Sequence, residues 1–346
     1  MSDEQGRFGI GVVGAGMGAK PHALALQSLS KDIAVLGVYR RDPVQRAEFC
    51  RTYNFSEAES YEALLADPRL DAVLVLTPPN AREAIVAAAA KAGKPVLMEK
   101  PVERTLLAAE RIVGLCDAAG VTLGIIFQHR FRRASRYLAD AVEENRYGPL
   151  EAAHLVVPWW RPQAGYYDQP GRGTVAQDGG GVLITQAIHS LDLMLSLCGP
   201  VDAVTAMAKT TRLHKMETED FVSAGIEFSS GAVGAIMATT ASFPGGPESL
   251  TLNFARATAT LTAGNLTIHT MAGETITEGE AGQGGGGADP MAFPFDWHAA
   301  QIADFADAVR HDRQPLSNGH TALHVHRLID AMMASAREGK RMGVSS

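Results

Sequence analysis

The first 128 residues alternate between short apolar runs and longer helical segments. Apolar runs such as FGIGVV, IAVLGVY, DAVLVL, PVLME and TLGIIF are separated by segments such as PHALALQSL and AREAIVAAAAKAG, with the short segment YEALLA among them. Short buried runs that are joined by helices are typical of right-handed βαβ crossovers. We therefore predict a six-strand alternation that folds as a doubly wound parallel sheet.

After about residue 150 the pattern changes. The segment GVLITQAIHSLDLMLSLCG predicts one apolar helix, and six runs with a period of two follow it without helices between them, from DAVTAMAKTTR to LTIHT. This pattern favours a large, mostly antiparallel open sheet. Two amphipathic segments near the end, HAAQIADFADAVRH and ALHVHRLIDAMMASAREG, predict helices that pack on this sheet or on the first domain. The run GQGGGGADP (282–290) predicts a surface loop.

The expected fold class is α/β, with one domain over 1–128 and a second over 129–346. A chain of 346 residues with 46% hydrophobic residues can form two cores. The net charge of −7 and the isoelectric point near 5.9 make nucleic acid and membrane surfaces unexpected partners. Three widely spaced cysteines offer neither a redox pair nor a metal site. Because the N-terminus has no apolar targeting segment, we expect a cytoplasmic protein. We also expect no bound metal.

The segment GVVGAGMGAKPH places a glycine turn directly after the first predicted strand. Gly14 and Gly16 allow a tight turn that brings backbone N–H groups close to a pyrophosphate, and Ala19 replaces the third glycine of the GxGxxG pattern. The position of this turn in the first βα unit indicates a dinucleotide-binding site. His22, within the following helix, is expected to have a structural role.

The end of the second predicted strand bears on which dinucleotide binds. A carboxylate at this position holds the ribose 2′-hydroxyl of NAD, whereas an arginine suits the 2′-phosphate of NADP. Arg40 occupies the position, which favours NADP over NAD. The alternative is that Arg40 and Arg41 are solvated and that Asp42 reaches the ribose.

At the end of the fifth major predicted strand, MEKP places Lys100 at the carboxyl edge of the sheet, where ligands bind. The ordered series GAGMGAKPH, TPPN, AGKPVLMEKP and DGGGVLITQAIHSLD resembles the Gfo/Idh/MocA oxidoreductase family over nearly the whole chain. The resemblance implies an NAD(P)-binding Rossmann domain (1–128) and a substrate-binding and oligomerisation domain (129–346).

The resemblance further implies that Lys100 and His189 form the catalytic site. His189 can accept a proton from a substrate hydroxyl while a hydride leaves for the nicotinamide, and Lys100 can orient that hydroxyl. Relatives commonly have Asp four residues before this histidine, where this chain has Thr185, which cannot supply a negative charge. On an α-helix Thr185, His189 and Asp192 would share one face. Asp192 is expected either to orient the site or to be an ordinary helix residue.

The expected contact residues come from several segments. Those for the cofactor are Gly14, Ala15, Gly16, Met17, Gly18, Arg40, Arg41, Thr77, Pro78, Asn80, Glu99, Lys100 and Gln128. Those for the substrate are Lys100, Arg130, Trp160, Arg161, Tyr167, Arg172, Thr185 and His189. Aromatic faces can stack on a sugar and arginines can bind hydroxyls or a carboxylate, although the same cluster could fill a seam between domains or protomers.

These residues together predict an NADP-preferring dehydrogenase of a monosaccharide, cyclitol or related polyol. The alternatives are a dehydrogenase of a cyclic dihydrodiol or hydroxy acid, a regulatory NADP-binding relative without catalysis, and an enzyme that recycles tightly held NAD(P) in a redox-neutral reaction. We also expect a homodimer or homotetramer that forms through the second domain's sheet, because a large exposed apolar sheet is a liability.

Overall fold

The computed structural model describes residues 6–279 and 294–344, so the loop predicted over 282–290 lies outside the described residues. The described chain divides into two compact units. The first comprises 6–103, 107–126 and 294–320, and the second comprises 104–106, 127–279 and 321–344.

The first unit is built on a five-stranded parallel sheet with the strand order β2-β1-β3-β4-β5. Its strands are β1 (Phe8–Val13), β2 (Ile33–Tyr39), β3 (Ala72–Val75), β4 (Val96–Met98) and β5 (Leu123–Ile125). The predicted parallel sheet is confirmed, but the predicted number of six strands is wrong. The segment YEALLA forms the short helix α3 (Tyr61–Leu65), because Ser60 caps it and Tyr61 and Leu64 bury one helical face. MEKP therefore follows the fourth strand of the chain, not the fifth.

The helices of the first unit are the connections between its strands and one returning segment. The connections contain η1 (Met17–Ala19), α1 (Lys20–Ser28), α2 (Pro43–Tyr53), η2 (Pro79–Ala81), α4 (Arg82–Lys91) and α5 (Leu106–Ala119). The returning segment is α9 (Asp296–Arg310), which packs against α1 and adds Ile302, Phe305 and Ala306 to the core around β1.

The second unit is built on a nine-stranded sheet with the order β13-β12-β11-β10-β6-β9-β8-β7-β14. All neighbouring strands are antiparallel except β6 and β9, which confirms the mostly antiparallel prediction. The strands are β6 (Leu150–Pro158), β7 (Val201–Lys209), β8 (Phe221–Phe228), β9 (Val233–Thr239), β10 (Ser249–Phe254), β11 (Ala257–Thr262), β12 (Asn265–Thr270), β13 (Thr275–Glu278) and β14 (Met342–Gly343).

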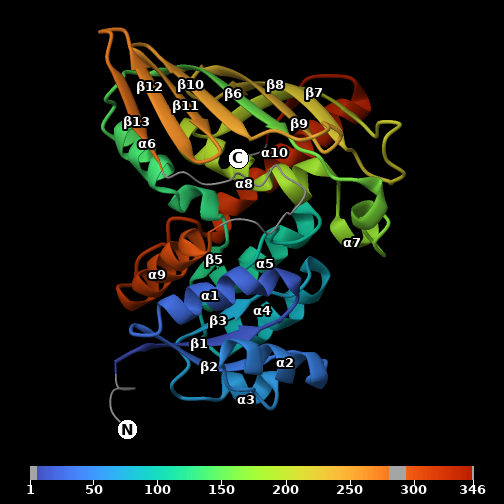
Figure 1. The fold of residues 1–346 in the computed structure, drawn as a ribbon, viewed down its shortest axis with the longest axis vertical. Helices are drawn as coiled ribbons and strands as arrows, with labels where there is room; N and C mark the ends of the chain where they lie inside the picture. Colours follow the sequence, from blue (N-terminus) through green and yellow to red (C-terminus); the bar gives the residue numbers. More distant parts are fainter. Residues whose placement is uncertain (1–5, 280–293, 345–346) are drawn as a thin grey trace. The chain divides into compact units, whose positions relative to one another are not determined.

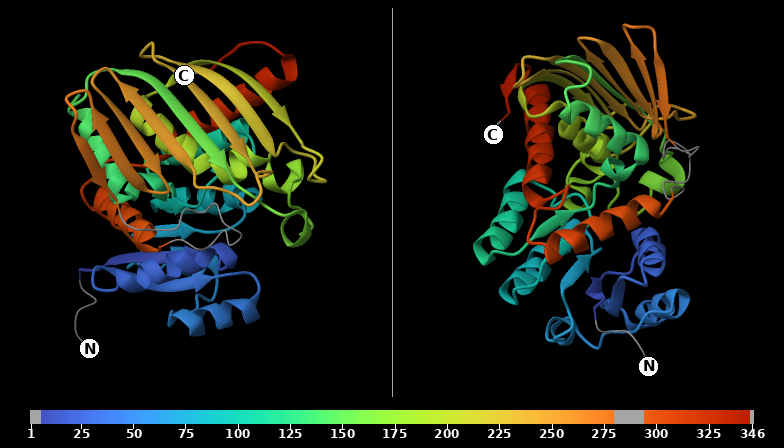
Figure 2. Two further views of the ribbon diagram at one scale, coloured as in Figure 1. Left: turned by 45° about the horizontal axis from the view of Figure 1, so that its top comes forward. Right: turned by 90° about the vertical axis from the view of Figure 1, so that its left-hand side faces the viewer.

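Helices cover one face of this sheet (Figures 1 and 2). They are α6 (Arg133–Glu143), α8 (Ile188–Cys198) and α10 (Gly319–Glu338), while the short α7 (Val175–Asp178) and the turn η3 (Gln128–Phe131) lie in the connections. The opposite face keeps large apolar side chains exposed, among them Met207 on β7 (53%) and Val233 on β9 (55%).

One helical stretch of the described residues, Val175–Cys198, is long and apolar enough to cross a membrane. Its apolar window is 89% buried inside the protein. A buried window of this kind is the core helix of a folded domain, and here it carries His189 into the centre of the second unit.

Candidate functional site

The glycine turn after β1 has the geometry of a phosphate cradle. Gly14 has a φ of 104°, and a Cβ at this position would lie 2.8 Å from the backbone carbon of Leu76. Only glycine therefore allows the turn to approach the end of β3. At Gly16 and Gly18 an added Cβ would have no atom within 4 Å, so the space in front of the turn is open. Because β1 and β3 flank the point where the strand order reverses, this space fits a dinucleotide pyrophosphate.

Arg40 lies beside this turn at the end of β2. Its guanidinium donates to the carbonyl of Ala15 and to the side chain of Gln45. Asp42, which was the alternative ribose contact, caps α2 instead and accepts from the N–H groups of Val44 (3.0 Å) and Gln45 (3.1 Å). The hydrogen bond from the backbone of Gln45 is the main cause that lowers the pKa of Asp42. Arg41 is exposed.

Lys100 follows β4, and its backbone is held by Glu99. The N–H of Lys100 donates to Oε2 of Glu99 at 3.0 Å, and Oε1 of Glu99 lies 2.7 Å from Nε2 of His22. Burial raises the pKa of Glu99, but the hydrogen bond and charge of His22 and the charge of Lys100 outweigh it and lower the pKa to about 2. The carboxylate expected to contact the cofactor therefore already binds these two partners.

The carbonyls of Thr77 and Lys100 both accept hydrogen bonds from the side chain of Arg82. The Nε of this arginine donates to the Thr77 carbonyl at 2.9 Å, and its terminal nitrogens donate to the carbonyls of Glu99, Lys100 and Pro101. The loops after β3 and β4 are thereby joined. Asn80, at the start of the same connection, lines an open depression with Ala84, Ala87 and Leu115.

His22, Glu99 and His298 are three side chains that could hold a metal ion, with ligand atoms within 4.8 Å of one another. The rings of His22 and His298 meet edge to face at 4.7 Å between centroids. Metal–ligand bonds of about 2.0–2.1 Å place tetrahedral ligands roughly 3.3 Å apart. The 2.7 Å contact between His22 and Glu99 is therefore a hydrogen bond, and the arrangement fits a buried polar network.

In the second unit, His189 is the second residue of α8, the regular part of the apolar helix. A π-helical turn (η5, Leu183–Ala187) precedes α8, so the α-helical phase that would align Thr185 with His189 does not extend through this segment. The hydroxyl of Thr185 donates to the carbonyl of Gly181 at 2.6 Å. His189 is 8% exposed, and its ring packs 5.2 Å from that of His129 and 5.8 Å from that of Phe127.

The turn η3, which carries Gln128 and Arg130, is tied to α8 by a buried ion pair. Nε and Nη2 of Arg130 each donate to one carboxylate oxygen of Asp192 at 2.6 Å. Burial raises the pKa of Asp192, and the charge of Arg130 opposes that effect. The guanidinium expected to bind substrate is thus paired. Oε1 of Gln128 is buried and has no hydrogen-bond partner among residues 6–279 and 294–344.

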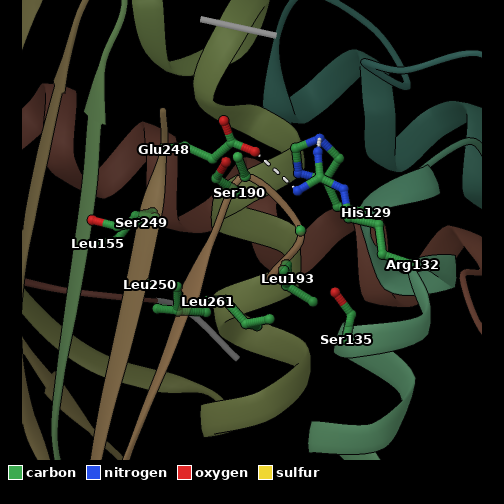
Figure 3. A pocket seen from close by; sticks show the side chains of 12 residues that line it. His129, Arg132, Ser135, Leu155, Ser190, Leu193, Glu248, Ser249, Leu250 and Leu261 are labelled. Atoms are coloured by element: carbon green, nitrogen blue, oxygen red, sulfur yellow. Dashed lines mark hydrogen bonds and ion pairs between the residues drawn. The ribbon is translucent and has the colours of Figure 1, made fainter. Parts of the chain in front are cut away.

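A small enclosed cavity adjoins this helix (Figure 3). Arg132 spans it, donating to Oε1 of Glu248 at 2.9 Å and to Nε2 of His129 at 2.7 Å. Since a guanidinium only donates, Nε2 of His129 accepts. The cavity volume is about 10 Å³, room for about one water. Oxygen atoms of Ser135, Ser190 and Glu248 have no partner within the described chain, so this cavity suits a water and is too small for a sugar.

The predicted aromatic segment is mostly packed against itself. Arg161 is 3% exposed, and its guanidinium lies 5.3 Å from the ring of Trp159 and 5.7 Å from that of Tyr166. The hydroxyl of Tyr166 accepts from Gln186 at 2.9 Å, which ties the segment to η5.

The other predicted residues of this segment differ in their exposure. The guanidinium of Arg172 lies 5.3 Å from the centre of the Tyr166 ring. Tyr167 is buried and its hydroxyl lies 2.7 Å from Oγ1 of Thr240, whereas Trp160 is half-buried against the exposed Phe243.

Several residues that organise the site were not expected from sequence. Arg82 stands at the start of a helix and Arg132 in the basic run QHRFRR, two contexts in which arginines are usually solvated. His298 looks like any polar residue of an amphipathic helix. The one signal in the sequence was the position of Arg82 two residues after TPPN, near the carboxyl edge of the sheet.

Comparison with known proteins agrees with this architecture. Residues 8–127 match the Gfo/Idh/MocA oxidoreductase family with an NAD-binding Rossmann fold, and residues 135–264 match the C-terminal domain of the same family. The WlbA dehydrogenase from Bordetella pertussis, solved with NADH and UDP-GlcNAcA, is 26% identical with a TM-score of 0.80 over 98% of this chain and 99% of that one.

The names of two curated relatives refer to sugars. The 1,5-anhydro-D-fructose reductase of Ensifer adhaerens is 34% identical over 50% of this chain and 52% of its own length. The D-xylose 1-dehydrogenase (NADP(+)) 2 of Haloferax volcanii is 26% identical over 95% of this chain and 98% of its own. Matches to three curated relatives, the Ensifer reductase among them, cover 52%, 64% and 53% of those proteins. With both domains matched in order, the chain belongs to the Gfo/Idh/MocA oxidoreductase family, whose NAD-binding Rossmann domain and C-terminal domain it contains.

Proposed function

We propose that this protein is an NADP-preferring dehydrogenase that oxidises a hydroxyl of a monosaccharide, cyclitol or related polyol. The observation that carries the proposal is the placement of Lys100 at the sheet edge that holds the glycine turn. The loop after β3 connects the two, because Gly14 approaches Leu76 and Thr77 while Arg82 binds Thr77 together with the Lys100 loop.

In the proposed reaction His189 takes the hydroxyl proton and Lys100 donates a hydrogen bond to the hydroxyl oxygen. Bound NADP⁺ supplies the acceptor for the hydride that leaves the same carbon. The cation of Lys100 favours a neutral imidazole, which a base requires. Thr185 contributes no charge, but its hydroxyl oxygen can accept a hydrogen bond from the substrate or the imidazole while it donates to Gly181.

Arg40 supports the preference for NADP. Its guanidinium lies at the glycine turn, where an arginine suits a 2′-phosphate, and Asp42 is engaged in capping α2. Some relatives were solved with NADH, and the Haloferax enzyme is named for NADP. The proposed preference for NADP over NAD therefore rests on Arg40.

Two observations support a polyol or sugar substrate: the names of the relatives, and the pairing and burial of the arginines that were predicted to bind substrate. A hydroxy acid would need a guanidinium for its carboxylate, but Arg172 lies 3.7 Å from the carboxylate of Asp178, Arg130 is paired with Asp192, and Arg161 is only 3% exposed. These pairings favour an uncharged polyol.

We further propose that a second copy of the chain covers the helix-free face of the nine-stranded sheet. Sedimentation showing a monomer at every concentration would contradict this.

The decisive experiment measures nicotinamide absorbance with NADP⁺ and NAD⁺ and a panel of aldoses, inositols, sugar acids and dihydrodiols. We expect one polyol class to reduce NADP⁺. His189→Asn should lower turnover by roughly 10²–10⁴ and leave cofactor affinity unchanged. His311→Asn, at a histidine directly after α9 whose side chain is 67% exposed, is the matched control and should retain wild-type turnover.

Other outcomes would identify the alternatives. If the protein binds NADPH tightly but no substrate of the panel reduces NADP⁺ or NAD⁺, the protein is regulatory. Cofactor that co-purifies and never exchanges would indicate redox-neutral chemistry. Equal turnover of wild type and His189→Asn would place the base elsewhere.

A further inference from the structure

Arg82 is a buried cation at the first position of α4 and belongs to no ion pair among the described residues. It is 3% exposed, and the acceptors of its hydrogen bonds are four backbone carbonyl oxygens. Arginine can make this set because its planar guanidinium carries five N–H donors in a fixed fork. A lysine has three donors on one atom and cannot reach carbonyls spread over two loops.

The cation is stable in this position because the carbonyl oxygens and nearby carboxylates offset its burial. Burial lowers the pKa of Arg82 to about 10, and the negative charges of Glu99 and Glu103 oppose the decrease. The guanidinium therefore stays charged at neutral pH. A buried charge with fixed acceptors is costly to leave unsatisfied, so the acceptors must stay where the guanidinium holds them.

The four acceptors belong to the two loops that the proposed reaction uses. Thr77 belongs to the loop after β3, which lies against Gly14 of the cofactor turn. Glu99, Lys100 and Pro101 form the loop after β4. Arg82 thus fixes the carbonyl side of the Lys100 loop, while the Glu99 carboxylate holds the N–H of Lys100.

We propose that Arg82 is a positioning residue that sets the place of Lys100 relative to the cofactor turn by binding both loops at once. This inference rests on the proposed function through the role of Lys100. Since a misplacement of about 1 Å can cost about 10²-fold in rate, loss of the guanidinium should affect turnover more than substrate binding.

The test compares Arg82→Ala, Arg82→Lys and wild type, with Arg111→Ala as the matched control. Arg111 is an exposed arginine of the same unit that pairs with Glu83 on α4, and its loss should change nothing. For each protein kcat, KM, the Kd of NADPH and the melting temperature are measured, with and without guanidinium ion at a low, non-denaturing concentration.

The proposal expects Arg82→Ala to lose about 10²-fold in kcat with KM changed by less than about threefold, and to bind NADPH about tenfold more weakly. Guanidinium should restore at least tenfold of the lost kcat by filling the vacated position. This readout separates positioning from stability, because guanidinium lowers the stability of any folded protein. Arg82→Lys should lose activity and gain nothing from guanidinium.

Two results would overturn the proposal. One is a kcat within about threefold of wild type in folded Arg82→Ala; the other is a loss that guanidinium does not restore. If Arg82→Ala does not fold, Arg82→Lys decides by the same kcat criterion. If wild type oxidises no substrate, the proposed function fails, and the NADPH Kd decides instead. Weaker binding in Arg82→Ala that guanidinium restores supports the positioning role, and an unchanged Kd refutes it.

Discussion

His298 makes the stability of the first unit dependent on pH between about 6.5 and 3. It lies on α9 with 2% of its surface exposed, and burial lowers the pKa of its ring to about 3, with the nearby His22 adding to the effect. In the unfolded chain this histidine binds a proton when the pH falls below its ordinary pKa of 6.5. The folded chain does not bind one until pH approaches 3.

The sign follows from this difference in bound protons. Between pH 6.5 and 3 the unfolded state holds more protons at His298 than the folded state, so acid stabilises the unfolded state and stability falls as pH falls. At pH 5 the gap of about 1.5 pH units below the ordinary pKa corresponds to about 2 kcal/mol. Glu99, whose pKa is lowered to about 2, adds a loss only below its ordinary value of 4.5.

The assay is urea unfolding, followed by circular dichroism, at pH 7 and pH 5. Wild type should lose about 2 kcal/mol more than His298→Gln between these two pH values, whatever the variant costs at pH 7. His311→Gln is the control, because its side chain is 67% exposed at the end of the same helix, and it should lose stability as wild type does. Equal pH dependence of wild type and His298→Gln would refute the reasoning.

Four further substitutions test other parts of the structure. Arg40→Ala should weaken NADPH binding by about 1.5–3 kcal/mol in fluorescence titrations and leave NADH unaffected; equal losses would remove Arg40 from the 2′-phosphate. Gly14→Ala should lower the melting temperature, because its Cβ would lie 2.8 Å from the backbone of Leu76. Gly16→Ala should melt like wild type but lose cofactor binding. A destabilised Gly16→Ala together with a fully stable Gly14→Ala would contradict the phosphate-binding geometry of the turn. Asp192→Asn leaves a largely buried guanidinium without its carboxylate, so calorimetry should show a loss of about 3 kcal/mol, or roughly 6–12 °C, and a shift below 2 °C would show that the pair is unimportant.

Sequence periodicity was sufficient to predict the two sheets, because each has a distinct pattern. Buried runs between helices indicated the parallel sheet, and period-2 runs indicated the antiparallel one. Strand β6 was not predicted, although it has the central place in the second sheet between β10 and β9. Its sequence LEAAHLVVP has two alanines and a histidine, so its alternation is weak in the sequence and is set by its neighbours.

The site was predictable where a residue's own chemistry defines its role, and not where a partner does. The glycine turn and Arg40 are recognisable from their positions after strands. The role of Arg82 depends on carbonyl groups of two other segments, and no spacing in the sequence encodes them. Similarly, Arg130 was expected to be available to substrate because the aspartate that pairs with it lies 62 residues away.

The return of α9 to the first unit constrains how the protein is made. Strands β1 to β5 are complete at Ile125, but the core around them lacks Ile302 and Phe305 until α9 has been synthesised, roughly 170 residues later. Phe305 packs so closely on β5 that a Cβ at Gly124 would lie 2.7 Å from its ring. Because domains generally fold as units during synthesis, the N-terminal domain of this chain must wait on the ribosome with an open core. In the C-terminal sheet, strands β6 to β13 precede α9, but the covering helix α10 and the edge strand β14 follow it, so neither unit is complete until the chain beyond α9 has been made.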